Sequence, residues 1–252
     1  MTKKRTVLIS GAGSESGIGF AAARKFTELN YQVFITGAST RIVDRAKEIS
    51  ATAFVADLTD TNQVSILIEN VIQTFGELDV LVNNAGMTSV DSPMDESESK
   101  SVFDVDYEKW QFEIMRNLDT AFLLTKAALP LLRKSGTGRI INVSSVTGPV
   151  MAMKGDAAYA AAKAGLVGLT RSLALDEAKF AITANAVSPG WISTGSQTKD
   201  ESAQGKRTPL GRSGTAEEVA TTICWLADAQ NGYLTGQNIV VDGGNSIAEE
   251  RL

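Results

Sequence analysis

Residues 7–19 read Val7-Leu8-Ile9-Ser10-Gly11-Ala12-Gly13-Ser14-Glu15-Ser16-Gly17-Ile18-Gly19, and this stretch decides the fold of the chain. The first three residues predict a short buried strand, and residues 20–29 carry the apolar pattern of a helix. The glycines between them allow a tight turn and a close approach of the backbone to a ligand. A strand, a glycine-rich turn and a helix in this order are typical of a phosphate-binding turn.

The same alternation of strand and helix continues along the whole chain. It predicts one domain over residues 1–252, an α/β fold with a doubly wound, parallel, seven-stranded sheet and helices on both faces. Two polar stretches interrupt the pattern: residues 87–106 predict an exposed loop, and residues 195–208 predict an uncapped, mobile segment. The further strands are expected at 33–36, 53–56, 80–82, 139–143, 183–187 and 237–241, and the further helices at 42–49, 61–75, 107–132, 157–180 and 216–227.

Composition excludes several classes of function. The 252 residues contain no histidine and one cysteine, so most transition-metal sites and all serine–histidine or cysteine–histidine machinery are excluded, and no metal is expected. Cys224 lies in an apolar run and predicts a buried thiol, which suits a cytoplasmic location. The net charge is −5, basic residues are scattered, and no 18-residue apolar run occurs, so nucleic-acid and membrane partners are not expected.

The chemistry is predicted by Tyr159-Ala160-Ala161-Ala162-Lys163. Tyr159 and Lys163 are four residues apart in a run of strong helix formers, so they share one helical face. An ammonium group beside a phenol is expected to lower the phenol pKa from its usual value of about 10. The pair would then transfer protons near neutral pH without a histidine.

The chain resembles the short-chain dehydrogenase/reductase family over nearly its whole length. The resemblance implies a single-domain Rossmann fold and an NAD(P)(H)-dependent oxidoreductase that interconverts a carbonyl and a secondary alcohol. The pattern is most similar to the 3-oxoacyl-ACP reductase type. A non-catalytic nucleotide sensor and a lyase or epimerase on the same fold remain alternatives. The matching residues are Gly11 with Gly17-Ile18-Gly19, Asp57, Asn83-Asn84-Ala85-Gly86, Asn117, Ser145, Tyr159-x-x-x-Lys163 and Pro189-Gly190.

The resemblance implies a role for each of four catalytic residues. Tyr159 exchanges a proton with the substrate oxygen, Lys163 lowers the Tyr159 pKa and binds the nicotinamide ribose, and Ser145 hydrogen-bonds the substrate oxygen. Asn117 shapes its helix and holds a water of the proton relay. The cofactor-binding residues expected from the turn and the resemblance are Gly11, Ser14, Gly17, Ile18, Gly19, Ala38, Ser39, Arg41, Asp57, Leu58, Asn84, Ala85, Gly86, Tyr159, Lys163, Pro189, Gly190, Ile192 and Thr194.

The choice of cofactor is predicted at the end of the second strand. A carboxylate there would bind the ribose hydroxyls of NAD, but the position is Gly37, with Arg41 nearby. NADP(H) is therefore favoured, with NAD(H) as the alternative. Five residues separate Gly11 from Gly17, where the family usually has three, and Glu15 within them argues mildly against a phosphate. We expect Glu15 to point to solvent.

Partners and substrate are predicted from surface composition. The helices from Tyr107 and Ala157 carry more apolar and small residues than one core-facing stripe needs, which predicts a homotetramer or a homodimer. The acidic loop 87–106 and a short lid at residues 195–208 predict a small, uncharged or cationic carbonyl substrate. The surplus side chains are Ala121, Leu123, Ala127, Ala128, Ala164, Leu166, Leu169 and Leu173.

Overall fold

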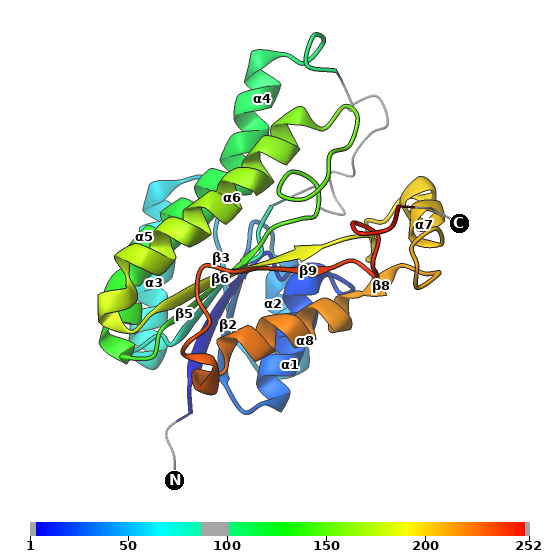
Figure 1. Ribbon diagram of the computed structural model, residues 1–252. Coiled ribbons are helices and arrows are strands. Elements are labelled where there is room, and N and C mark those ends of the chain that lie inside the picture. Colours follow the sequence, from blue (N-terminus) through cyan, green and yellow to red (C-terminus); the bar gives the residue numbers. More distant parts are fainter. Residues whose placement is uncertain (1–3, 87–100, 250–252) are drawn as a thin grey trace.

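The computed structural model describes residues 4–86 and 101–249. They form a seven-stranded sheet in the order β3-β2-β1-β4-β5-β6-β9, and every neighbouring pair is parallel (Figure 1). The predicted doubly wound sheet is confirmed. The strands are β1 (Thr6–Ser10), β2 (Gln32–Gly37), β3 (Thr52–Val55), β4 (Val80–Asn83), β5 (Arg139–Val143), β6 (Thr183–Pro189) and β9 (Asn238–Val241).

Helices cover both faces of the sheet. Side chains of α1, α2 and α8 pack in one apolar cluster, and those of α3, α5 and α6 pack in a second one on the other face. The helices are α1 (Ile18–Glu28), α2 (Arg41–Ile49), α3 (Thr61–Phe75), α4 (Tyr107–Ile114), α5 (Thr120–Ser135), α6 (Ala157–Asp176), α7 (Lys199–Gly205) and α8 (Ala216–Ala227), with short 3₁₀ turns at Ala178–Phe180 and Ala229–Asn231.

Strand β1 shows how the sequence builds two cores. All five of its residues are buried. Val7 and Ile9 contribute to the cluster of α1 and α8, whereas Leu8 contributes to the cluster on the opposite face. Because successive side chains of a strand point to opposite faces, a run of consecutive apolar residues serves a sheet that is covered on both sides.

Helix boundaries follow from capping residues. The Asp60 side chain accepts hydrogen bonds from the backbone N–H groups of Asn62 and Gln63 and starts α3, and Gly76 ends it at φ 73°. Thr215 and Glu218 form a reciprocal capping box at the start of α8. The predicted bounds of these two helices are confirmed.

Three predicted segments are wrong in detail. The helix expected over 107–132 is divided by a π-helical turn at Met115–Asp119 and extends to Ser135. The helix expected over 157–180 ends at Asp176 because a 3₁₀ turn follows. The segment 195–208 was expected to be uncapped, but it contains α7, which starts with a capping box of Thr198 and Glu201.

Near the carboxyl ends of the main strands, the chain forms a second, two-stranded sheet that the sequence did not predict. Strands β7 (Ile192–Ser193) and β8 (Gly214–Thr215) pair in parallel there.

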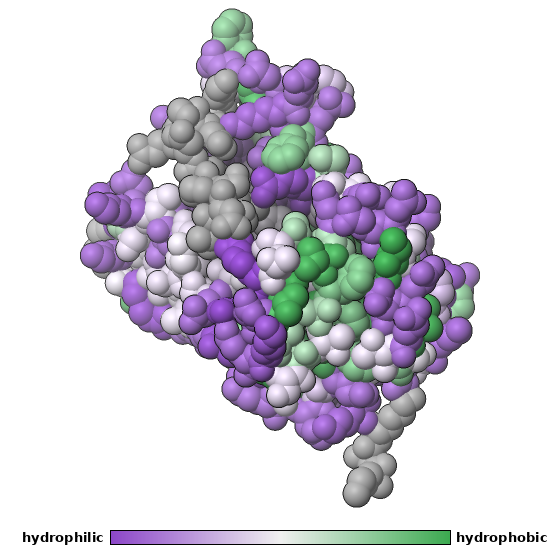
Figure 2. Space-filling model, turned by 180° about the vertical axis from the view of Figure 1, so that it is seen from behind, coloured by the Kyte–Doolittle hydropathy of each residue, from purple (hydrophilic) through white to green (hydrophobic). Residues whose placement is uncertain are grey.

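Of the predicted loop 87–106, residues 87–100 lie outside the described residues; in the remainder Val102 and Phe103 are exposed. Seen from behind, the surface shows an apolar area bordered by polar side chains (Figure 2). Within the described residues, no helix has the length and apolarity needed to span a bilayer.

Candidate active site

The predicted site residues follow strands whose carboxyl ends meet at one edge, because the sheet is parallel throughout. The glycine-rich turn follows β1, and it packs directly against the turn that follows β4. A Cβ on Gly11 would lie 2.8 Å from the Cα of Ala85, and one on Gly19 would lie 2.7 Å from the carbonyl oxygen of Gly11. Glycine is required at both positions, because a larger residue at position 11 would separate the two turns and one at position 19 would overlap the first turn itself.

Hydrogen bonds fasten these two turns together. The Asn84 amide group donates to the carbonyl oxygens of Ser10 (3.1 Å) and Gly11 (3.0 Å). The Ser10 hydroxyl oxygen accepts the backbone N–H groups of Asn84 and Ala85, each at 3.0 Å. The Asn84 side chain therefore braces the glycine-rich turn.

The start of α1 fits a phosphate group. Gly17 is the N-cap residue and has no side chain to occupy the first backbone N–H groups, and the first turn contains no acidic residue. These groups and the positive end of the helix dipole are therefore available to an anion. Ser14 closes the turn, since its carbonyl oxygen accepts the Gly17 N–H at 3.1 Å.

The end of β2 offers basic groups and no carboxylate. Gly37 ends the strand, Ala38 is exposed, and the Arg41 guanidinium donates to the Ser39 hydroxyl at 3.2 Å. Glu15 extends to α2, where its carboxylate lies 3.4 Å from the Arg45 guanidinium. The Glu15 side chain is 81% exposed, which confirms that it lies in solvent.

Asp57 and Leu58 follow β3. One carboxylate oxygen of Asp57 accepts the N–H (2.9 Å) and the hydroxyl (2.7 Å) of Thr59, so it caps the local turn. Leu58 is buried, and its side chain belongs to the apolar core. Because its side chain is buried in the core, Leu58 could contact a cofactor only through its backbone.

The segment after β6 leaves the sheet at the same carboxyl edge. Pro189 ends β6, and a Cβ on Gly190 would lie 2.7 Å from the Asp242 Cβ, so only glycine fits there. Ile192 lies in β7, and the Thr194 hydroxyl hydrogen-bonds with that of Ser196 at 3.1 Å.

Ser145 and Tyr159 are in direct contact. Ser145 follows β5, and its hydroxyl oxygen accepts the Thr147 N–H at 3.1 Å. The Ser145 side chain is also hydrogen-bonded to the Tyr159 phenol. The Ser144 hydroxyl instead donates to the backbone of α6, at the Lys163 carbonyl oxygen, 2.9 Å away. Two adjacent hydroxyl groups, those of Ser145 and Tyr159, can thus bind one substrate oxygen.

The direction of the Tyr159 pKa shift corrects the sequence prediction. Burial raises the pKa of Tyr159 to about 12, although the Ser145 hydrogen bond opposes this. Burial also lowers the pKa of Lys163 to about 8. The Lys163 ammonium lies 5.6 Å from the centre of the Tyr159 ring and donates to the Val143 carbonyl oxygen at 3.1 Å. Desolvation of the phenol therefore outweighs the expected effect of the nearby cation.

Asn117 lies in the π-helical turn and is buried. Its amide group donates to both the carbonyl oxygen and the carboxylate of Glu113, each at 3.0 Å. A Cβ on Gly86 would lie 2.9 Å from the Asn117 amide oxygen and 3.4 Å from the Lys163 nitrogen. The structure thus brings Asn117, Lys163 and Gly86 to one place.

Comparisons with known proteins agree with this arrangement. A family model described as enoyl-(acyl carrier protein) reductase matches residues 11–246. The chain is 38% identical to a 3-oxoacyl-[acyl-carrier-protein] reductase of Synechocystis, over 93% of this chain and 92% of the relative. It is 36% identical to a Staphylococcus aureus reductase of the same name, over 97% and 99%. The chain belongs to the short-chain dehydrogenase/reductase family.

A solved structure supports the same assignment. Levodione reductase superposes with a TM-score of 0.88 at 27% identity, over 97% of this chain and 98% of that one. This short-chain dehydrogenase/reductase is therefore an oxidoreductase with the Rossmann-like fold of its family, and the family implies an NAD(P)(H) cofactor. The glycine-rich turn and the uncapped start of α1 fit such a dinucleotide.

Three carboxylates beside Tyr159 were not predicted as site residues. Asp156, Glu201 and Glu113 come from the N-cap of α6, from α7 and from α4, and each raises the pKa of Tyr159. Burial and the charges of Glu113 and Glu201 also raise the pKa of Asp156, against the opposite effect of Lys109. The Thr198-x-x-Glu201 spacing is a capping-box signal in the sequence, but the grouping of the carboxylates depends on the fold.

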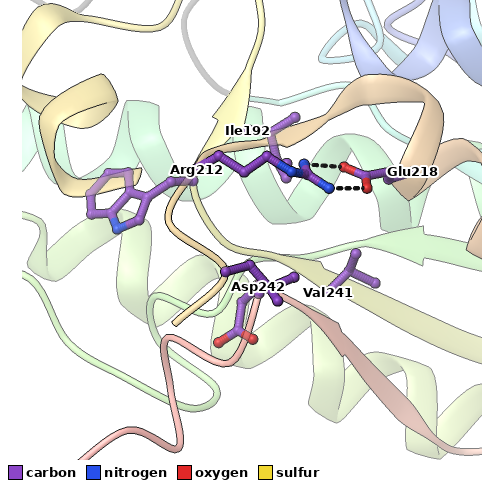
Figure 3. Close-up of a pocket in the computed structure, with 9 residues that line it drawn as sticks. Ile192, Arg212, Glu218, Val241 and Asp242 are labelled. Atoms are coloured by element: carbon purple, nitrogen blue, oxygen red, sulfur yellow. Dashed lines mark hydrogen bonds and ion pairs between the residues drawn. The ribbon is translucent and has the colours of Figure 1, made fainter. Parts of the chain in front are cut away.

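A cavity of about 110 Å³ lies beyond β7 in this short-chain dehydrogenase/reductase (Figure 3). The Arg212 guanidinium crosses it and donates two hydrogen bonds to Glu218, at 2.7 and 2.9 Å. The same pair therefore joins the segment after α7 to the start of α8. This contact supports β8, and through the β7–β8 pairing it supports Ile192.

Proposed function

We propose that the chain reduces a small ketone to a secondary alcohol with NADP(H), and that it catalyses the reverse reaction. The observation that carries the proposal is the hydrogen-bonded pair of Ser145 and Tyr159 beside the buried Lys163. Two hydroxyl donors fit a carbonyl oxygen that gains negative charge during the reaction. The nicotinamide supplies the hydride when it is bound.

The residues of the chain supply position and a proton. Ser145 holds the substrate oxygen, and Tyr159 gives its hydroxyl proton to that oxygen as the carbonyl carbon is reduced. A phenol with a pKa of about 12 is protonated at neutral pH, so Tyr159 is present as the acid that reduction needs. Lys163 and Asn117 complete the route by which Tyr159 regains a proton.

NADP(H) is preferred in this proposal because β2 ends without a carboxylate. The guanidinium groups of Arg41 and Arg45 lie on the adjacent helix, and a 2′-phosphate is an anion that such groups bind. Arg45 is shared with Glu15 and with Glu48, which lies 2.6 Å away. Arg41 is the first residue of α2, four positions after Gly37, so Arg41 and Arg45 are both candidates for the phosphate.

The substrate in this proposal is small and uncharged or cationic. Asp156, Glu201 and Glu113 would repel an anionic carrier such as acyl-ACP or a CoA thioester, and Lys109 offsets only part of their charge. The acidic loop that first suggested this substrate class lies largely outside the described residues. The three carboxylates supply independent support for it.

A cofactor-oxidation assay tests the proposal. NADPH and NADH are each supplied with neutral, cationic and CoA-linked ketones, and the products are identified. Tyr159→Phe is expected to lower turnover by at least about 100-fold while the cofactor still binds, because no other acid replaces the phenol. Tyr233→Phe is the matched control, since Tyr233 is fully exposed. Near-normal turnover by Tyr159→Phe, or efficient turnover of acetoacetyl-CoA by the wild type, contradicts the proposal.

We also propose that the chain assembles into a homotetramer or homodimer through α4, α5 and α6, in a reducing compartment such as the cytoplasm. The apolar surplus is smaller than the sequence suggested, because Ala121, Ala128, Leu166 and Leu173 are buried within the protomer. Phe112 on α4 and Phe122 on α5 are each 47% exposed and support the proposal. Light scattering that shows only monomer at micromolar concentration contradicts it.

A further inference from the structure

The lengthened glycine-rich turn makes a contact that its sequence did not explain. The backbone N–H of Gly195 donates to the Ser16 hydroxyl oxygen at 2.7 Å, although the two residues are 179 positions apart. Ser16 belongs to the five-residue spacing between Gly11 and Gly17, where the family usually has three residues. The additional length therefore reaches a distant part of the chain.

This hydrogen bond joins the two ends of the candidate cofactor cleft. Ser16 precedes the N-cap of α1, which fits a phosphate, whereas Gly195 follows Thr194, which is expected beside the nicotinamide. Their parent strands β1 and β6 are separated by β4 and β5 in the sheet. Three strand spacings amount to about 14 Å, so the contact spans the carboxyl edge where a dinucleotide binds.

Contacts with other parts of the chain support the segments that carry Ser16 and Gly195. On the Gly195 side, the Gln197 N–H donates to the Thr194 carbonyl oxygen at 3.0 Å, and the Gln197 amide group donates to the Ser213 hydroxyl at 2.9 Å. On the other side, Glu15 is drawn to Arg45 on α2. The Ser16 contact is thus made between two supported segments.

The fit around Gly195 is close. A Cβ on this residue would lie 2.8 Å from the Ser16 hydroxyl oxygen, which is shorter than an ordinary contact. A side chain at position 195 would therefore displace the Ser16 hydroxyl group from its hydrogen-bonding position. Gly13, in the same turn, has nothing within 4 Å of the position of a Cβ. The constraint at Gly195 thus comes from Ser16, whereas Gly13 has room for a side chain.

We propose that Ser16 is a positioning residue that fastens the Thr194–Gly195 segment to the glycine-rich turn and so slows release of the nicotinamide cofactor. The inference rests on the proposed function, because it places the dinucleotide along the carboxyl edge that this contact spans. Release then requires the Ser16–Gly195 hydrogen bond to open. The chemical step does not involve Ser16, so the hydrogen bond affects cofactor affinity and leaves proton transfer unchanged.

The test measures the dissociation rate of NADPH by stopped-flow fluorescence, independently of turnover. Ser16→Ala is expected to raise this rate and the KM for cofactor by about two- to tenfold, the effect of one neutral hydrogen bond, without lowering kcat. Ser16→Thr keeps a hydroxyl group and is expected to restore slow release. Ser65→Ala is the matched control, because it removes one exposed hydroxyl hydrogen bond on α3, outside the candidate site, and it is expected to leave the rate unchanged.

A double-mutant cycle identifies the contact itself. Gly195→Ala is expected to speed release in the wild type but to add nothing in the Ser16→Ala background, because the hydroxyl it would displace is already absent. The inference is overturned if the two substitutions act independently, or if Ser16→Ala releases the cofactor at the wild-type rate. In either case, cofactor binding by the wild type still upholds the proposed function. A wild-type protein that binds neither NADPH nor NADH overturns both.

Discussion

Gly148→Ala is expected to disable the candidate active site by a displacement of its backbone. Gly148 has φ 104° and lies in the segment between β5 and α6, three residues after Ser145. A Cβ there would overlap the carbonyl oxygen of Ala160 and lie 2.9 Å from its carbonyl carbon. Ala160 follows Tyr159, so the substituted side chain would press directly on the helix that carries the phenol.

The size of the effect follows from this geometry. Ordinary contacts begin at 3.4 Å, so the segment and α6 must separate by at least about 0.5 Å, and by more to free the carbonyl oxygen. Ser145 and Tyr159 lie on the two parts that separate. A misplacement of about 1 Å can cost about 100-fold in rate, and we expect kcat to fall by about 10- to 100-fold. The positive φ adds strain of about 1–3 kcal/mol.

The assay compares kcat, cofactor binding and urea unfolding with those of Gly136→Ala. Gly136 has φ 69°, but a Cβ there would meet nothing within 4 Å. This control carries strain without overlap, so it is expected to lose stability and to keep its kcat. Gly148→Ala is expected still to bind the cofactor, because the glycine-rich turn is untouched, but less tightly than the wild type, because the displaced helix α6 carries Lys163. A kcat within about twofold of the wild type would refute the reasoning.

Four further predictions concern titration, reactivity and cofactor choice. The rate of ketone reduction is expected to fall as pH rises through about 8, where Lys163 loses its charge; a pH–rate profile that stays flat to about pH 10 contradicts this. In the oxidation direction the rate is expected to rise with pH, because Tyr159 must first lose its proton. Glu113→Gln removes one of the charges that raise the Tyr159 pKa, so it is expected to move this rise in rate to lower pH. Burial raises the pKa of Cys224 to about 12, so iodoacetamide is expected to alkylate it only after unfolding, and rapid labelling of the native protein in a mass spectrum argues against this. Gly37→Asp is expected to shift preference from NADP(H) to NAD(H) by repelling the 2′-phosphate, and titration of both cofactors measures the ratio.

Much of the site could be predicted because it depends on local patterns. The strand before Gly11 and the helix after it follow from apolar periodicity, and a parallel sheet brings the residues after β4 and β5 to the same edge. Spacing also places Tyr159 and Lys163 on one helical face. What spacing does not contain is the degree of burial, which reverses the expected pKa shift of Tyr159.

The remaining features depend on contacts between distant segments or on weak local signals. Helix α7 has seven mainly polar residues, so it has no apolar stripe, and its Thr198–Glu201 capping box was its one sequence signal. No periodic pattern in the sequence predicts the Ser16–Gly195 hydrogen bond. The grouping of Glu113 with carboxylates from two other elements likewise appears only when the helices are packed together.

The π-helical turn accommodates one extra residue without rotating the helix before it relative to the helix after it. The Thr120 N–H donates to the Met115 carbonyl oxygen, five residues back, so the turn holds one residue more than a turn of α-helix does. Deletion of Leu118 would let this turn close with the α-helical hydrogen bond to the fourth residue back, and α4 would keep its orientation relative to α5. Within α5, which has no extra residue to lose, the same deletion would rotate the two flanking parts by about 100° relative to each other. A one-residue gap at the π-helical turn in the sequence of a relative is therefore compatible with the same helix packing, whereas a gap of the same size within α5 is not.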